Sequence, residues 1–154
     1  MSVLAAIRPD DLNLLLFVHV LGAMVFVGSL LLAGTVLAGA WNDGSAERVR
    51  LGFRTLLIAV VPSYLVMRVF GQVLESKDDY EAVEDSAWIG IGYGTTELGL
   101  LLIIASSIAA GVGSRKALRD GGPVGTSGKV ATVLVWIMVV LFTITIWAMT
   151  TKPE

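Results

Sequence analysis

The sequence predicts an all-α fold: a polytopic membrane protein built as one antiparallel bundle of four transmembrane helices. Three observations support this prediction. Hydrophobic residues make up 55% of the 154-residue chain. Only 16% of the residues are charged, and most of them lie between long apolar segments. Each of the four apolar segments is long enough to cross the ~30 Å hydrocarbon core of a bilayer at a helical rise of about 1.5 Å per residue.

The four apolar segments define the predicted spans, and we place them in one domain. The spans are 12–40, 51–74, 87–113 and 129–150, within a domain of residues 1–154. Backbone polar groups cannot bond to water inside a bilayer, so segments of this length are expected to be helices. The predicted connections are Trp41–Arg50, Glu75–Ser86 and Ser114–Gly128. Connections this short favour antiparallel neighbours in an up-down bundle.

The first span is predicted to be a retained helix and not a cleaved signal peptide. The residues before it contain one basic residue, Arg8, which is followed by Asp10 and Asp11. A secretory signal instead begins with a basic region and has an apolar core of about 7–15 residues. The apolar run from Leu14 to Ala40 is longer than such a core.

Features of the second and third spans predict how the helices pack. Pro62 has no amide hydrogen to donate, which predicts a kink in the second span. Gly90 and Gly94 form a small-xxx-small pair in the third span, and small residues continue from there to Gly113. Small residues allow helix backbones to approach closely. We expect this surface to pack within the bundle and not between two copies of the chain.

The distribution of basic residues predicts the orientation in a bacterial inner membrane, because cytoplasmic loops are enriched in lysine and arginine. The first and third connections and the span ends beside them hold Arg48, Arg50, Arg54, Arg115, Lys116, Arg119 and Lys129. The opposite side holds Arg8, Lys77 and Lys152, with Arg68 just inside the second span. Both termini are therefore predicted to be extracytoplasmic.

His19, the only histidine, lies in the first span and is the strongest indication of a functional site. Titratable side chains are costly inside a bilayer, so each is a functional-site candidate. Counting from the outer ends of the spans places His19, Arg68 and Glu97 about 9, 9 and 15 Å deep, in one layer. Tyr64 precedes Arg68 by four residues and shares its helix face. We predict that Arg68 and Glu97 face inward and are partners, because a lone charge facing lipid is unfavourable.

The same polar layer has explanations that need no ligand. His19 could be a neutral imidazole that is hydrogen-bonded to a neighbouring helix. Arg68 could extend to the outer headgroups, as long basic side chains do. Glu97 would lie closer to the surface if the third span began late, near Tyr93.

Haem b or copper is the cofactor that this layer predicts, because neutral imidazole ligates both metals. In a haem site, His19 would be the axial ligand, Gly22 would lie one turn deeper, and Arg68 would neutralise the propionates. One histidine permits five-coordinate haem, His/Met ligation through Met67 or Met149, or bis-His ligation across a dimer. The predicted cofactor-binding residues are His19, Gly22, Tyr64, Arg68 and Glu97. For a metal such as copper, the predicted ligands are His19, Met24 and Met67.

Several classes of function are excluded by the composition and the motifs. The sequence contains no cysteine, which excludes disulfides, iron–sulfur clusters and thiolate nucleophiles. The glycine-rich stretch before Lys129 is not a P-loop, because Val130 stands where serine or threonine is required. Anionic lipid explains the basic loops, so no nucleic-acid partner is predicted. The expected partners are the lipid bilayer and either a second copy of the chain or a larger membrane complex.

The stretch from Phe17 to Gly28, FVHVLGAMVFVG, resembles the first helix of the small four-helix bacterial membrane proteins of the DUF2269 group. That helix is similar to an LHxxG-like helix of CopD-type copper-resistance membrane domains, and HemJ-type protoporphyrinogen oxidases have a comparable early histidine. The resemblance implies a four-helix membrane fold. The function of the DUF2269 group is not characterised, and from the other two groups only His19 carries over by position.

Three functions remain open, and the sequence does not decide whether the protein is an enzyme. The first hypothesis is a small membrane protein that binds a haem or metal cofactor through His19. The second is a transporter or permeation module for a small solute or cation, which uses the same polar layer. The third is a structural or accessory subunit in which the polar layer locks the bundle without a ligand of its own.

Overall fold

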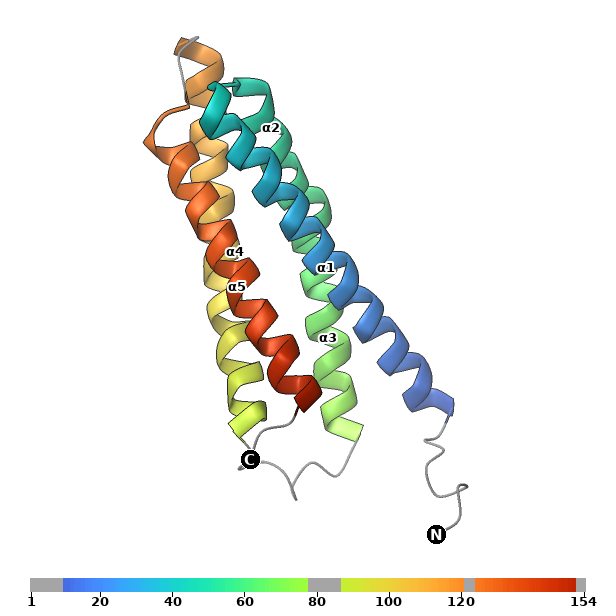
Figure 1. The fold of residues 1–154 in the computed structure, drawn as a ribbon. Helices are drawn as coiled ribbons and strands as arrows, with labels where there is room; N and C mark the ends of the chain where they lie inside the picture. The colour runs from blue at the N-terminus through green and yellow to red at the C-terminus, as the bar shows by residue number, and fades with distance from the viewer. Residues whose placement is uncertain (1–9, 78–86, 121–123, 152–154) are drawn as a thin grey trace.

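The computed structural model describes residues 10–77, 87–120 and 124–151, and within these ranges the chain is helical apart from two short connections. The elements are α1 (Asp10–Asp43), α2 (Ala46–Thr55), the π-helical turn η2 (Leu56–Val60), α3 (Val61–Lys77), α4 (Ala87–Asp120) and α5 (Thr126–Thr151). Figure 1 shows that α2, η2 and α3 follow one another as a single long rod. The predicted all-α fold is confirmed.

Four helices of the described chain are long and apolar enough to cross a membrane. They are Leu12–Asp43, Ala46–Lys77, Gly90–Asp120 and Thr126–Thr151. Each helix extends past at least one end of the apolar segment from which it was predicted, because polar residues continue the helix there; α4 is extended only at its C-terminal end. Part of the predicted connection Glu75–Ser86 is helical up to Lys77, and the remainder lies outside the described residues.

The first predicted connection, Trp41–Arg50, is wrong because it is nearly all helix. Only Gly44 and Ser45 separate α1 from α2. Gly44 has a φ of 71°, the left-handed conformation that commonly ends a helix, and its amide donates to the carbonyl of Ala40. The hydroxyl of Ser45 accepts a hydrogen bond from the amide of Arg48 at 3.3 Å and caps the start of α2. The polar sequence here is therefore a tight helix–helix turn.

Pro62 changes the second span in a specific way. The amide of Val61 donates to the carbonyl of Leu56, five residues earlier, so the turn before Pro62 is π-helical. A proline cannot donate an amide hydrogen, and its ring crowds the carbonyl four residues before it. The wider turn makes room for the ring while the helix continues. Where the sequence predicted a kink, the structure thus has a π turn.

Aromatic side chains meet at the centre of the bundle. The ring of Phe26 on α1 lies 5.6 Å from that of Tyr64 on α3 and 4.6 Å from that of Phe142 on α5. Gly99 supplies the space on α4, because a Cβ atom there would lie 2.8 Å from the Phe142 ring. All four spans therefore contribute to one buried layer.

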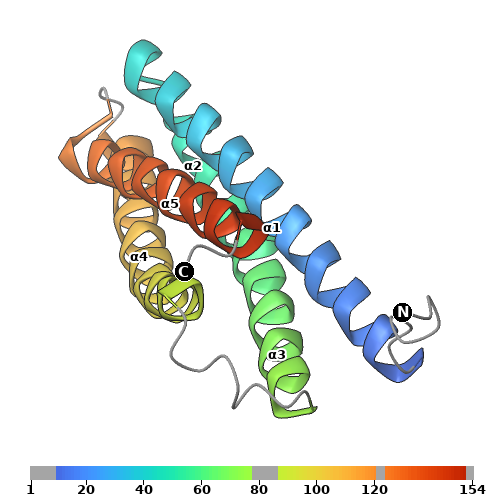
Figure 2. The same cartoon turned by 60° about the horizontal axis from the view of Figure 1, so that its bottom comes forward.

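Packing differs between the two ends of the bundle. The α2 end comprises α2, the end of α1, the end of α4 and the start of α5. The α3 end comprises α3 and the opposite ends of the other helices (Figures 1 and 2). α1 packs along α2, α3 and α5, and α4 packs along α5 and against α2. By contrast, α3 makes only sparse backbone contact with α4 and α5.

The small-residue surface of α4 packs as predicted over only part of its length. Ser106 and Ala110 are fully buried. A Cβ atom on Gly113 would lie 2.9 Å from the backbone nitrogen of Gly128, so α4 and α5 touch there. Gly90 and Gly94, however, have no atom of the described residues within 4 Å of an added Cβ atom. The prediction that this pair packs within the bundle is wrong, because α4 is rotated so that both glycines face outward.

Candidate functional site: a polar layer at the α3 end

His19 on α1 is tied to the backbone of α3. Its Nδ1 atom lies 2.7 Å from the carbonyl oxygen of Met67, and the side chain is partly buried. A carbonyl oxygen can only accept a hydrogen bond, so Nδ1 is the nitrogen that carries the proton. In the neutral ring, Nε2 is then the nitrogen with the free lone pair.

Two glycines allow α1 and α3 to approach closely around this hydrogen bond. A Cβ atom on Gly71 would lie 3.0 Å from Cε1 and 3.1 Å from Nδ1 of His19, so the missing side chain makes room for the imidazole. A Cβ atom on Gly22 would lie 3.0 Å from the backbone nitrogen of Met67. The imidazole is therefore packed edge-on against α3 and held there by its hydrogen bond.

A second polar contact joins α3 to α4. The hydroxyl of Tyr64 donates to the carbonyl oxygen of Thr96 at 2.8 Å. Tyr64 is buried, and its ring belongs to the aromatic layer at the bundle centre. The hydroxyl of Thr96 donates to the carbonyl of Gly92 within its own helix. The ring of Tyr64 thus packs in the aromatic core, while its hydroxyl belongs to the polar layer.

Arg68 and Glu97 form an ion pair between α3 and α4, so the prediction that they are partners is confirmed. The guanidinium of Arg68 also lies 5.9 Å from the centre of the Tyr93 ring, within the range of a cation–π contact. The Arg68 side chain is 21% exposed and that of Glu97 is 62% exposed. The prediction that both face inward is therefore wrong for Glu97, which reaches Arg68 from the outer side of α4.

The two parts of the polar layer lie at one height along α3 but on different faces. Met67, whose carbonyl oxygen meets His19, directly precedes Arg68. Among the described residues, no hydrogen bond or ion pair connects His19 to Arg68 or Glu97. α3 is thus the common element, which contacts α1 through one part of the layer and α4 through the other.

The residues predicted to hold haem or a metal are not assembled into a ligand set. Met24 is 68% exposed and lies about 140° around α1 from His19, given its five-residue spacing. Met67 meets the imidazole through its backbone carbonyl. Gly22 faces the backbone of α3, so the space beside it is filled. Within the described residues no group of three or more His, Asp or Glu side chains is placed to hold a metal ion. Within one chain, a haem or metal site would therefore rest on the single ring nitrogen Nε2 of His19.

Sequence reasoning missed one participant in the layer, Gly71, and it did not predict the backbone role of Thr96. Gly71 follows Met67 by four residues, and this spacing on one helix face was the available signal. Thr96 contributes its backbone carbonyl, for which no side-chain pattern gives a signal.

Comparisons with protein-family models, curated proteins and solved structures give no match. The similarity of residues 17–28 to the DUF2269 group therefore stays a prediction. Function has to be argued from the geometry of the polar layer.

Proposed function

We propose that this chain is a structural or accessory subunit of a bacterial inner membrane. Its helices would cross the bilayer as an antiparallel bundle, with the α2 end in the cytoplasm and both termini outside. The polar layer would act as a lock between helices and not as a ligand site. One observation carries the proposal. The side chains of His19, Tyr64 and Arg68 each make a polar contact with a neighbouring helix.

Two of the three polar contacts of the lock lie between helices whose backbones make little contact. α3 has only sparse backbone contact with α4, and two polar contacts, Tyr64 to Thr96 and Arg68 to Glu97, bridge these helices. In membrane proteins an interhelical hydrogen bond contributes about 0.6 kcal/mol on average and up to about 1.7 kcal/mol. Such contacts are modest in free energy, but they are directional and fix the position of α3 relative to α4.

A double-mutant cycle between His19 and Gly71 tests the lock directly. His19→Ala should lower the free energy of unfolding by about 1 kcal/mol, because the bond to Met67 is lost. Gly71→Ala should lower it by a similar amount, because the new methyl group would collide with the imidazole. In the His19→Ala background, Gly71→Ala should cost almost nothing. The free energies would be measured by reversible denaturation in detergent micelles.

Gly28→Ala on α1, the helix of His19, is the control for an added methyl group, because no described atom lies within 4 Å of a Cβ atom at that position. It should leave the free energy of unfolding nearly unchanged. Additive effects of His19→Ala and Gly71→Ala would show that the imidazole does not pack against α3 and would contradict the proposal.

Binding of a metal or haem through His19 is the second candidate function. It is favoured by the hydrogen bond at Nδ1, because such a bond orients a ligating imidazole and leaves Nε2 for the metal. Further ligands would have to come from a second copy of the chain or another subunit. The test is a UV–visible spectrum with metal analysis of protein purified from native membranes. A Soret band or stoichiometric copper that disappears in His19→Ala would replace the structural proposal.

A permeation pathway is the remaining candidate, and it is favoured by the exposed carboxylate of Glu97 on α4, which makes little backbone contact with α3. Opening of the Arg68–Glu97 pair would free a carboxylate for a cation. A flux of protons or K⁺ into liposomes that falls in Glu97→Gln but not in Gly94→Ala would support this function. Absence of flux with a folded protein would leave the lock as the role of the pair.

A further inference from the structure

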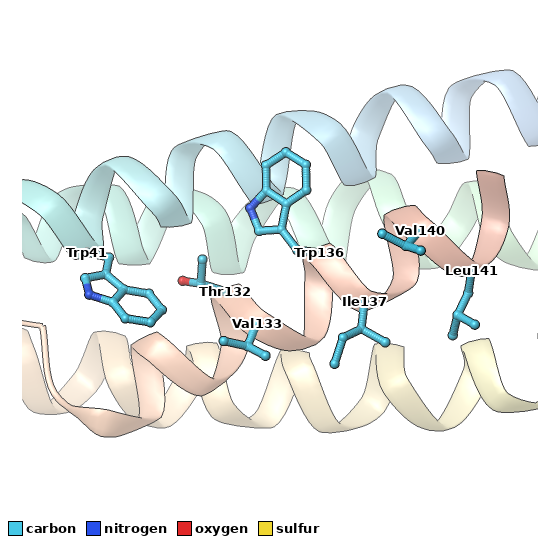
Figure 3. A pocket seen from close by; sticks show the side chains of 7 residues that line it. All are labelled: Trp41, Thr132, Val133, Trp136, Ile137, Val140 and Leu141. Atoms are coloured by element: carbon cyan, nitrogen blue, oxygen red, sulfur yellow. The ribbon is translucent and has the colours of Figure 1, made fainter. Parts of the chain in front are cut away.

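A shallow apolar groove of about 450 Å³ runs along α5 from the α2 end towards the centre of the bundle. It is lined by Trp41, Thr132, Val133, Trp136, Ile137, Val140 and Leu141. Figure 3 shows the indole of Trp41 at one end of the groove and Val140 and Leu141 at the other. The hydroxyl of Thr132 donates to the carbonyl of Gly128 within α5, so its hydrogen is already used in a bond inside the helix. The lining therefore favours hydrocarbon.

The wall of the groove is fixed by contact between α5 and α1. The indole of Trp136 lies against Gly34, where an added Cβ atom would be 3.3 Å from Cε2. Trp41 and Trp136 are both partly exposed, so their rings present apolar surface outward. A ligand in the groove would contact two indole rings that the bundle holds in place.

The ammonium group of a lysine lies at the Trp41 end of this groove. The Nζ atom of Lys129 lies 5.4 Å from the centre of the Trp41 ring, a cation–π distance. Lys129 forms no ion pair with a carboxylate in the described part of the chain. Lys129 shares one face of α5 with Val133, Trp136 and Val140, because successive residues of this set are three or four positions apart. Lys129 is the first residue of this stripe. A positive charge followed by an apolar stripe matches an anionic amphiphile.

The length of the stripe agrees with one leaflet of a bilayer. From Lys129 to Leu141 the helix rises about 18 Å, while half of the hydrocarbon core is about 15 Å thick. We propose that the groove binds one acyl chain of an anionic phospholipid and that Lys129 binds the phosphate of its headgroup. This inference rests on the proposed insertion of the bundle in a membrane. It adds a specific lipid site on the cytoplasmic side.

Fluorescence quenching by brominated lipids tests the site. In the full chain with Trp88→Phe and Trp147→Phe, the remaining emission comes from Trp41 and Trp136 of the groove. The protein would be placed in nanodiscs of phosphatidylglycerol and phosphatidylcholine, with bromine on the acyl chains of one lipid at a time. We expect stronger quenching when the brominated lipid is phosphatidylglycerol. Lys129→Gln should reduce this preference about fivefold, the effect of removing one basic contact with an anionic membrane.

Two further variants separate the charge from the groove. Lys116→Gln is the matched control, because Lys116 is an exposed lysine of α4 at the same end of the bundle. It should leave the preference unchanged. Val140→Phe would fill the groove without changing any charge and should lower quenching by both lipids. Because Val140 is itself exposed, this substitution should not disturb folding.

The outcomes distinguish failure of the lipid site from failure of membrane insertion. Equal quenching by both lipids, or equal loss of preference in Lys116→Gln and Lys129→Gln, would overturn the lipid site and leave insertion intact. Absence of quenching by either lipid would overturn both proposals. Addition of inorganic phosphate should not change the quenching, and competition by it would show a phosphate site without a lipid.

Discussion

Two pairs of helices, one at each end of the bundle, are held together by different interactions. At the α2 end, small residues bring backbones into contact, as where Gly113 of α4 meets Gly128 of α5. At the α3 end, α3 is joined to α4 chiefly by the polar contacts of Tyr64 and Arg68. Backbone contact leaves no space for an added atom, whereas a polar contact between sparsely packed helices can be lost and the helices can move. Substitutions at the two ends should therefore differ in cost and in character.

The largest effect is expected from Gly113→Ala at the α2 end. The added Cβ atom would lie 2.9 Å from the backbone nitrogen of Gly128, so α4 and α5 would have to separate. Overpacking of this kind typically costs 1–3 kcal/mol, and we expect about 3 kcal/mol because the obstacle is backbone. Denaturation in detergent micelles would measure the change.

Gly94→Ala in the same helix is the control, because it faces open space. Alanine is a better helix former than glycine, so this variant should be neutral or more stable by up to about 1 kcal/mol. Equal destabilisation by both substitutions would mean that the α2 end is not held by backbone contact and would remove the contrast between the ends.

The next largest effect is expected at the α3 end from Arg68→Met. This variant leaves the carboxylate of Glu97 without its partner, and we expect a loss of about 2 kcal/mol, between the values for exposed and buried pairs. Arg68→Met combined with Glu97→Met should regain much of this loss, because neither charge then remains. A double variant less stable than Arg68→Met would show that the ion pair does not couple the two positions. Stability would again be measured by denaturation in micelles.

Hydropathy located the four spans but not the ends of the helices. A helix needs only backbone hydrogen bonds and suitable residues, so α4 continues through polar residues to Asp120, beyond the predicted limit of 113. The turn at Gly44 and Ser45 carried a recognisable signal, a glycine followed by a capping serine. The π turn before Pro62 had no such signal, because a kink and a wider turn both accommodate a proline.

The candidate site was predictable where it depends on spacing and depth. The depths of Arg68 and Glu97, counted from the outer ends of their spans, placed the two residues in one layer and so predicted that they pair. The rotation of α4 about its own axis was not predictable, and it decides that Gly90, Gly94 and Glu97 face outward. Spacing shows which residues share a helix face, but which neighbour that face meets depends on the packing of the whole bundle.

The smallest effect is expected from Tyr64→Phe, which keeps the aromatic ring beside Phe26 and removes only the hydroxyl. The lost hydrogen bond to the carbonyl of Thr96 should cost about 1 kcal/mol. Thr143→Val is the matched control, because its hydroxyl donates to the carbonyl of Val139 within its own helix α5, and we expect almost no change. Disulfide crosslinking between cysteines introduced into α3 and α4 would report the separation of the two helices. If Tyr64→Phe and Thr143→Val have equal effects on both stability and crosslinking, the Tyr64 hydroxyl does not lock the α3 end, and the polar link between α3 and α4 must then come from the Arg68–Glu97 pair.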